Sequence, residues 1–186
     1  LSDALKLCSD LKITHKIIEI QPILDSFVAQ IGEPLPNLRI GNLSARARMC
    51  LLYDYSARVN ALVVGTSNKS ERLLGYGTIY GDMACALNPI GELFKTEIYE
   101  LARELGIDEK IIAKAPSADL WEGQSDEADI GYSYERLDEI LRLAQSKSED
   151  ELAHKFDPML VATVFLKMRA NKFKLSLPPI ASVDVE

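Results

Sequence analysis

The chain has 186 residues and a formal net charge of −7, a length that suits one domain with a sizeable core and is short for two. Nucleic acids bind to concentrated basic surfaces, and the sequence has no run of Lys and Arg, so a nucleic-acid partner is not expected. No apolar run approaches the ~20 residues that a membrane span requires. We therefore expect a soluble single domain over residues 1–186, with no membrane partner.

The sequence offers little material for disulfide, zinc or histidine chemistry. Its three cysteines, Cys8, Cys50 and Cys85, are odd in number, widely spaced and set among apolar residues. They are typical of buried thiols in a reducing compartment, which predicts a cytoplasmic protein. The two histidines, His15 and His154, favour structural roles.

The N-terminal third predicts helices and one strand. Residues 1–10 have helical apolar spacing, and Thr14–Ile20 are rich in β-branched residues, which predicts a strand. A helix followed by a strand is half of a βαβ unit, so we expect the first strand of that unit to lie upstream of residue 1. A short helix over 22–31 and a longer one over 42–58 follow.

A short apolar run over 61–64 ends at Gly65 and leads into polar residues 66–71. This pattern is typical of a buried parallel strand that ends in a loop. Ligands of open α/β sheets bind beyond the carboxyl ends of such strands, so we expect a binding site here. The glycines Gly75, Gly77 and Gly81 permit turns or close backbone approach.

A second short strand is predicted over 83–87, and apolar residues at helical spacing predict a helix over 94–105. Lys95 lies in the first turn of that helix, where the macrodipole disfavours a cation, so we expect a bound anion to account for the charge there. Residues 117–131 have no clear periodicity, and we expect a mobile loop that serves as a lid. Helices after Ser133, Ser148 and Asp157 complete a helical C-terminal part. The whole pattern indicates an α/β fold.

Local patterns leave several roles open. Glu71 stands three residues after Asn68, so it is equally explained as a helix-cap carboxylate. Lys95 taken alone is more often a surface charge. Thr66 and Ser117 taken alone are most often turn or cap hydroxyls.

Several ordered motifs resemble those of the ammonia-dependent NAD synthetases, which are ATP-pyrophosphatase-loop enzymes of the adenine nucleotide alpha hydrolase-like group. The motifs are Gly65-Thr-Ser-Asn-Lys-Ser-Glu71, Tyr80-Gly-Asp82, Asn88-Pro-Ile-Gly91 with Lys95-Thr96, Ala115-Pro-Ser-Ala-Asp-Leu-Trp121 and Gln124-Ser-Asp-Glu127. The resemblance covers nearly the whole chain. It implies a Rossmann-like fold with a mostly parallel sheet flanked by helices, whose first βα unit is missing here.

The resemblance also implies a reaction. ATP adenylates the carboxylate of nicotinic acid adenine dinucleotide, and ammonia then displaces AMP to form NAD. By position, the resemblance implies that Glu71 ligates Mg²⁺, that Lys95 is catalytic and contacts ATP phosphates, and that Thr66 and Ser117 contact ATP. It implies substrate binding by Arg46 and, less closely matched, by Lys174, together with a homodimer.

Because Arg46 and Arg48 are two residues apart, they point roughly 200° from each other on a helix, and only one of them can face a site. Arg46 taken alone is usually a surface ion-pair partner.

The sequence departs from the family in one important way. The Ser-Gly-Gly-x-Asp-Ser loop, which cradles pyrophosphate and supplies a second magnesium carboxylate, does not occur in these 186 residues. We expect it upstream of residue 1, and we favour a fragment of a longer protein over a core that cannot catalyse the reaction alone. Some relatives also carry a lysine and an aspartate where this chain has Ile79 and Ala86.

Two alternative functions remain open at this point. The first is a different adenylating enzyme on the same fold, although the tRNA-acting relatives tend to have basic surfaces or extra cysteines. The second is a non-catalytic nucleotide-binding or dimerisation module, because the phosphate loop is missing. The chain as given contains no glutaminase domain, so we expect free ammonia to be the nitrogen donor.

Overall fold

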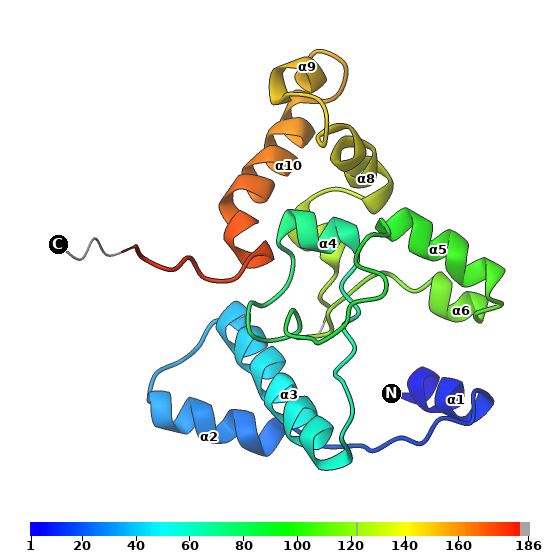
Figure 1. Cartoon of the computed structure of the whole chain (residues 1–186), viewed down its shortest axis with the longest axis vertical. Helices are drawn as coiled ribbons and strands as arrows, with labels where there is room; N and C mark the ends of the chain where they lie inside the picture. Colours follow the sequence, from blue (N-terminus) through cyan, green and yellow to red (C-terminus); the bar gives the residue numbers. More distant parts are fainter. Residues whose placement is uncertain (122, 183–186) are drawn as a thin grey trace.

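Helices make up the regular structure of residues 1–121 and 123–182, which are the residues that this computed structural model describes (Figure 1). They are α1 (Ser2–Asp10), α2 (Gln21–Ile31), α3 (Asn37–Val59), α4 (Lys69–Leu74), α5 (Lys95–Glu104), α6 (Glu109–Ile112), α7 (Asp126–Ile130), α8 (Tyr134–Leu143), α9 (Glu149–Ala153), α10 (Pro158–Asn171) and the 3₁₀ helix η1 (Lys172–Leu175). The helical C-terminal part that the sequence predicted is confirmed. No helix of the described residues is long and apolar enough to cross a membrane.

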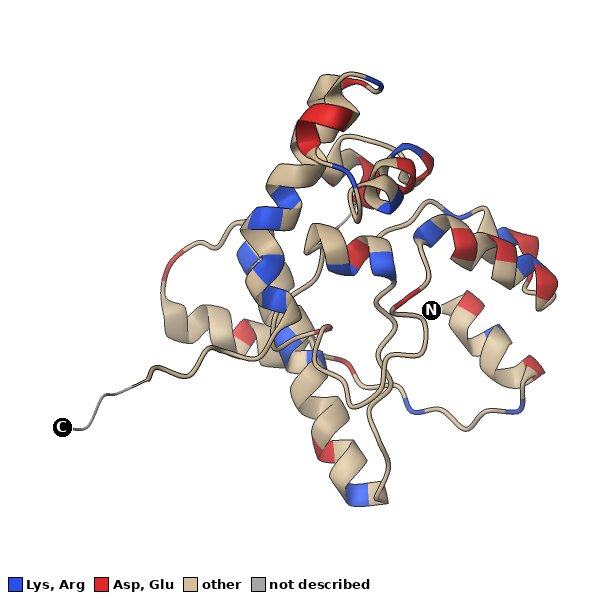
Figure 2. Cartoon of the chain, turned by 45° about the horizontal axis from the view of Figure 1, so that its top comes forward, with Lys and Arg blue, Asp and Glu red and all other residues tan. Residues whose placement is uncertain are grey.

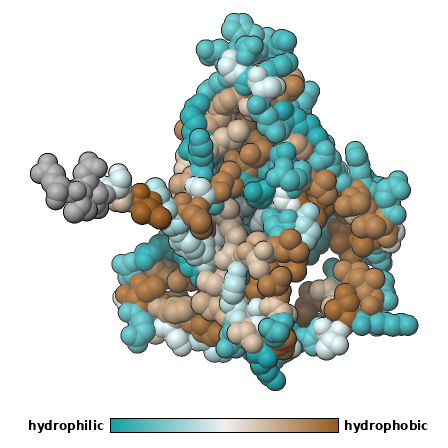
Figure 3. Space-filling view, viewed as in Figure 1, coloured by the Kyte–Doolittle hydropathy of each residue, from teal (hydrophilic) through white to brown (hydrophobic). Residues whose placement is uncertain are grey.

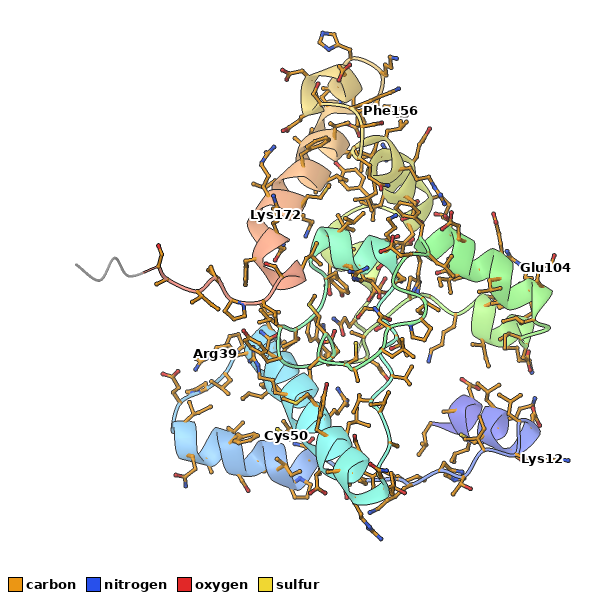
Figure 4. All side chains as sticks on the ribbon, in the orientation of Figure 1. Lys12, Arg39, Cys50, Glu104, Phe156 and Lys172 are labelled. Atoms are coloured by element: carbon orange, nitrogen blue, oxygen red, sulfur yellow. The ribbon has the colours of Figure 1, made fainter. Side chains whose placement is uncertain are left out.

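The hydrophobic core lies between α4, α8, α9 and α10. On α8 the apolar residues recur at the spacing of one helical face, so that face is fully buried. Figure 4 shows Phe156 between α9 and α10, where it packs against the core. The buried members are Leu74, Phe94, Ile130, Tyr134, Leu137, Ile140, Leu141, Leu152, Leu160, Val161 and Val164. The central helix α4 is therefore anchored by the C-terminal helices.

Two further groups of helices complete the molecule. Helix α2 packs on α3, and α6 packs on α5, which in turn contacts α8 (Figure 1). Helix α3 begins at Asn37, five residues earlier than the predicted boundary at 42, because Pro36 in an extended conformation forms its N-cap. Helix α7 lies inside the segment predicted as a loop, and five residues are too few to show a helical period. The predicted lid also includes residue 122, which lies outside the described residues.

The predicted helix caps were largely correct. Ser148 and Glu151 form a capping box at the start of α9, in which the Ser148 hydroxyl accepts a hydrogen bond from the backbone N–H of Glu151. Asp157 caps α10 in the same way, by accepting from the N–H of Met159 at 3.0 Å. Ser133 is the N-cap residue of α8, but its side chain makes no cap hydrogen bond.

The predicted sheet is not confirmed in the described residues. Thr14–Ile20 were predicted as a strand, and this was wrong: residues 13–20 form an irregular connection. A strand needs a neighbouring strand for its N–H and C=O groups, and no described residue pairs with this segment. The segments 61–64 and 83–87 meet only at an isolated parallel bridge between Val64 and Leu87.

The cysteines were predicted to be buried, and this was wrong as well. Cys50 is exposed on α3, where Figure 4 labels it, and Cys8 and Cys85 are half-buried. All three are free thiols. Apolar neighbours in the sequence did not predict burial, because the face of a helix that a residue occupies decides its exposure.

The packing of α10 on the core can be tested with two leucines of the same helix. Leu160 is 3% exposed and Leu166 is 62% exposed. We expect Leu160→Ala to lower the free energy of unfolding by about 2–5 kcal/mol, because the change removes buried methyl groups and leaves a cavity. Leu166→Ala should change it by less than about 0.5 kcal/mol. Urea unfolding of the two variants measures both values, and equal effects would contradict the packing described here.

Candidate active site

A cleft of about 600 Å³ lies beside the N-terminal ends of α4 and α5. Its wall includes one face of α3, the loop after Val64, the glycine-rich turn after α4 and residues from the segments 117–121 and 124–129. Of the six residues predicted for the site, the cleft gathers five: Thr66, Glu71, Lys95, Ser117 and Lys174. They come from four separate parts of the chain, so the fold brings distant residues to one place.

The backbone around Gly65 sets the position of the first loop. The N–H of Gly65 donates to the Leu87 carbonyl at 2.7 Å, and the N–H of Ala86 donates to the Val63 carbonyl at 2.9 Å. A side chain at position 65 would bring its Cβ to 2.5 Å from Cys85 Sγ, so only glycine fits. Thr66 follows at once and faces the cleft. The loop after Val64 therefore reaches the site, as the sequence predicted. The run 61–64 before it was predicted as a buried strand, and this was wrong, because Leu62 is 71% and Val64 56% exposed and the run makes only an isolated bridge among the described residues.

Glu71 has two roles in this structure. One carboxylate oxygen, Oε2, accepts the backbone N–H of Asn68 at 3.0 Å, while Asn68 Oδ1 accepts the N–H of Glu71 at 2.9 Å. This is the capping box that the spacing predicted. The other oxygen, Oε1, lies 3.4 Å from Lys95 Nζ. The cap interpretation and the binding-site interpretation are therefore both compatible with the geometry.

Lys95 is the first residue of α5 and its ammonium faces Glu71 across the cleft. Figure 2 shows the charged residues of α4 near the start of α5, where a basic residue (blue) is followed by an acidic one (red). The ammonium also lies 5.4 Å from the centre of the Tyr134 ring. Glu71 thus supplies a protein carboxylate beside Lys95, and the bound anion expected there stays a prediction. Burial raises the pKa of Glu71 above its ordinary value of 4.5, and Lys95 opposes this shift.

Lys174 reaches the cleft from η1 and binds backbone carbonyls. Its Nζ donates to the carbonyls of Gly75 at 2.7 Å and Gly77 at 3.0 Å. Gly75 has a φ of +66°, and a Cβ there would lie 2.0 Å from Asn171 Cβ, so the turn requires glycine. Burial lowers the pKa of Lys174. This lysine therefore holds the turn after α4, and its role in binding substrate stays a prediction.

The two arginines of α3 behave as their spacing predicted, since only one faces the cleft. The one on the cleft wall is Arg48. Arg46, which the resemblance selected, instead donates to the Ile79 carbonyl at 3.4 Å. Substrate binding by Arg46 stays a prediction.

Ser117 is on the wall, and its Oγ accepts the N–H of Asp119 at 3.0 Å, so it also makes the local turn contact.

Several polar groups on the wall or directly beside it were given no role from the sequence. The Tyr76 hydroxyl donates to Asp129 at 2.8 Å, and the Tyr134 hydroxyl donates to Asp126 at 3.3 Å. Asp126 is 4% exposed, and its Oδ1 has no hydrogen-bond partner among the described residues. Burial raises the pKa of both tyrosines. The signal for Asp126 was the motif Gln124-Ser-Asp-Glu127, whereas no sequence pattern singled out the two tyrosines or Asp129.

The carboxylates of the cleft fit a magnesium ion only together with a ligand. Within the described part of the chain, no group of three or more His, Cys, Asp or Glu side chains is placed to hold a metal ion. Mg²⁺ is usually held by one or two carboxylates, with water and substrate phosphates completing its coordination. Glu71, with 17% of its side chain exposed, is a donor of that kind.

Comparison with known proteins places these features in a family. Residues 1–178 match the NAD synthase family profile. The chain is 56% identical over 183 residues to an NH(3)-dependent NAD(+) synthetase of Campylobacter jejuni, which covers 98% of this chain and 74% of that protein. It is 50% identical over 187 residues to the Helicobacter pylori protein of the same name, covering 97% and 72%.

Solved structures show the same relationship. A Campylobacter jejuni NH3-dependent NAD synthetase in complex with nitrate superposes with a TM-score of 0.80 at 48% identity, covering 97% of this chain and 71% of that one. An NMN synthetase from Francisella tularensis superposes with a TM-score of 0.87 at 32% identity, covering 98% and 72%. The chain belongs to the NAD synthase family.

Proposed function

We propose that this protein catalyses the ATP-dependent amidation of nicotinic acid adenine dinucleotide to NAD, with ammonia as the nitrogen donor. The enzyme is a ligase that forms a C–N bond. The substrate carboxylate attacks the α-phosphorus of ATP and pyrophosphate leaves; ammonia then attacks the adenylated carbonyl carbon and AMP leaves. The observation that carries the proposal is the pair of Glu71 and Lys95, 3.4 Å apart in one cleft of a chain that belongs to this family.

Lys95 is placed to offset charge in the first step. A carboxylate that approaches the α-phosphate of ATP brings negative charges together, and a fixed cation lowers the barrier that this creates. The Lys95 side chain is only 18% exposed, so water and salt screen the electric field of its ammonium less than that of a surface lysine. The hydroxyls of Thr66 and Ser117 lie on the same wall and supply hydrogen-bond donors for ATP.

Glu71 is the proposed protein ligand of Mg²⁺, because its Oε1 faces the cleft while Oε2 is held by the helix cap. The ion, when bound, neutralises phosphate charge and polarises a phosphoryl oxygen. Substrate binding is proposed for Arg46 and Lys174. Arg48 is a further candidate for the same task, since it lies on the cleft wall.

The remaining family properties are proposed for this chain as well. They are one NAD synthetase-like domain over residues 1–186 and a Rossmann-like, mostly parallel sheet. The TM-scores of 0.80 and 0.87 support a shared fold.

A homodimer is supported by large apolar side chains exposed on α2 and α3, and Figure 3 shows hydrophobic surface in that region. Three free thiols support a reducing, cytoplasmic location.

The reaction is tested by product analysis of the full-length protein. With ATP, Mg²⁺, ammonium and nicotinic acid adenine dinucleotide, we expect NAD, AMP and pyrophosphate in equal amounts by chromatography. Nicotinic acid mononucleotide is the matched alternative substrate, because one structural relative is an NMN synthetase. Amidation of the mononucleotide alone would change the substrate assignment. If isothermal titration gave no heat for ATP with Mg²⁺, the non-catalytic module would be the better description.

Glu71→Gln should abolish adenylation and leave the fold intact. The amide keeps an oxygen that accepts the N–H of Asn68, so the cap survives, while the charge that a metal ion requires is lost. Exchange of labelled pyrophosphate into ATP measures the first step, and circular dichroism checks the fold. Glu151→Gln is the matched control, since Glu151 holds the same position in the capping box of α9. Unchanged turnover of Glu71→Gln at saturating Mg²⁺ would exclude its metal role.

Lys95→Met should lower turnover by orders of magnitude or raise the ATP concentration needed for half-maximal rate. Methionine fills similar space but provides no charge for the phosphates. Initial rates at varied ATP separate the two effects. Lys69→Met is the control, because Lys69 is also the first residue of a helix but pairs with Glu92. A wild-type rate for Lys95→Met would remove this lysine from the site.

A further inference from the structure

A buried carboxylate of α8 joins the two helices that carry the cleft's charged pair. Asp138 is 1% exposed and lies on the face of α8 that packs on α4 and α5. Its Oδ1 accepts the hydroxyl of Ser70, and its Oδ2 accepts the backbone N–H of Thr96 at 2.9 Å. Both oxygens are therefore engaged, one by each helix.

Ser70 completes the connection between α4 and α5. It is fully buried, and its Oγ accepts the backbone N–H of Lys95 at 2.9 Å while its hydroxyl hydrogen is donated to Asp138. Lys95 and Thr96 are the first two residues of α5, whose N–H groups have no partner within the helix. The N-cap residue Phe94 has no side-chain oxygen to satisfy them. Two other helices supply the missing acceptors instead.

The hydrogen bonds of Asp138 and Ser70 act on the charged pair itself or on its direct neighbours in the chain. Ser70 immediately precedes Glu71, and the N–H bound by Ser70 belongs to Lys95 itself. We propose that Asp138 is a positioning residue that, through Ser70 and the first turn of α5, sets the separation of the Glu71 carboxylate and the Lys95 ammonium. It touches neither group, and it acts through the Ser70 side chain of α4 and the backbone N–H of Thr96 in α5.

This proposal rests on the proposed function, because the separation matters only if both groups act on the same substrate. A misplacement of about 1 Å in a reacting group can reduce the rate by about 100-fold. Loss of the Asp138 carboxylate releases the first turn of α5, but it changes none of the residues that line the cleft. The chemistry of the site is thus retained and its geometry is changed.

The test compares Asp138→Ala with Asp157→Ala in the full-length protein, at a temperature where circular dichroism shows both to be folded. Each change removes a carboxylate that caps a helix, but Asp157 caps α10, outside the cleft wall. We expect kcat to fall by about 100-fold for Asp138→Ala, with KM for ATP changed by less than about threefold. Asp138→Asn, which keeps one acceptor for the N–H of Thr96, should recover part of the loss. A kcat for Asp138→Ala equal to that of Asp157→Ala would overturn the proposal.

Two further measurements keep the test decisive. If Asp138→Ala does not fold, Ser70→Ala removes the same link from the other side and should also lower kcat; a wild-type kcat there would overturn the proposal. Amide hydrogen exchange should accelerate at Thr96 in Asp138→Ala and at Lys95 in Ser70→Ala, because each change removes the acceptor of that N–H, and unchanged exchange would contradict the link. Because exchange needs no substrate, it tests the positioning even if the wild-type protein makes no NAD, which would instead reject the proposed function.

Discussion

The ion pair between Glu71 and Lys95 is the interaction on which the cleft depends. The two side chains are 24 positions apart in the sequence, and each belongs to the first turn of a short helix. Their side chains are 17% and 18% exposed, so water screens the pair less than it would on the open surface. A separation of 3.4 Å is long for an ion-pair hydrogen bond, and such a pair can exchange its partner for a charged ligand.

The position of this ion pair is set by the packing of α4 and α5 on the C-terminal helices, and not by the residues that line the cleft. Helix α4 is held at its far end by Asn171, whose Nδ2 donates to the Leu74 carbonyl at 3.1 Å, and by Lys174 beyond it. At its near end it contacts α5 and α8. A helix of six residues is not stable alone, because helix nucleation is costly. Its orientation therefore derives from the C-terminal core, which makes α8 to α10 part of the active-site architecture.

The sequence predicted those features that depend on near neighbours in the chain. The caps at Asn68 and Ser148 and most helix limits follow from spacings of three or four residues. The strand predicted at Thr14–Ile20 failed because strand propensity needs a paired neighbour, which no described residue provides. The joint position of Glu71 and Lys95 came from family resemblance, since no local pattern relates them. The contacts of Asp126 and Tyr76 went unassigned for the same reason, because tertiary packing alone creates them.

The two oxygens of Glu71 explain why a local interpretation and a functional one agree at this position. Oε2 completes the capping box and so fixes the orientation of the whole carboxylate, including Oε1. Oε1 is then presented to the cleft, where it faces Lys95 Nζ at 3.4 Å. An aspartate would be one methylene shorter and could not reach both the Asn68 backbone and Lys95. The cap is therefore the device that orients the functional oxygen, and a cap motif that faces a cleft carries more information about function than the same motif at the surface, as at Glu151 in α9.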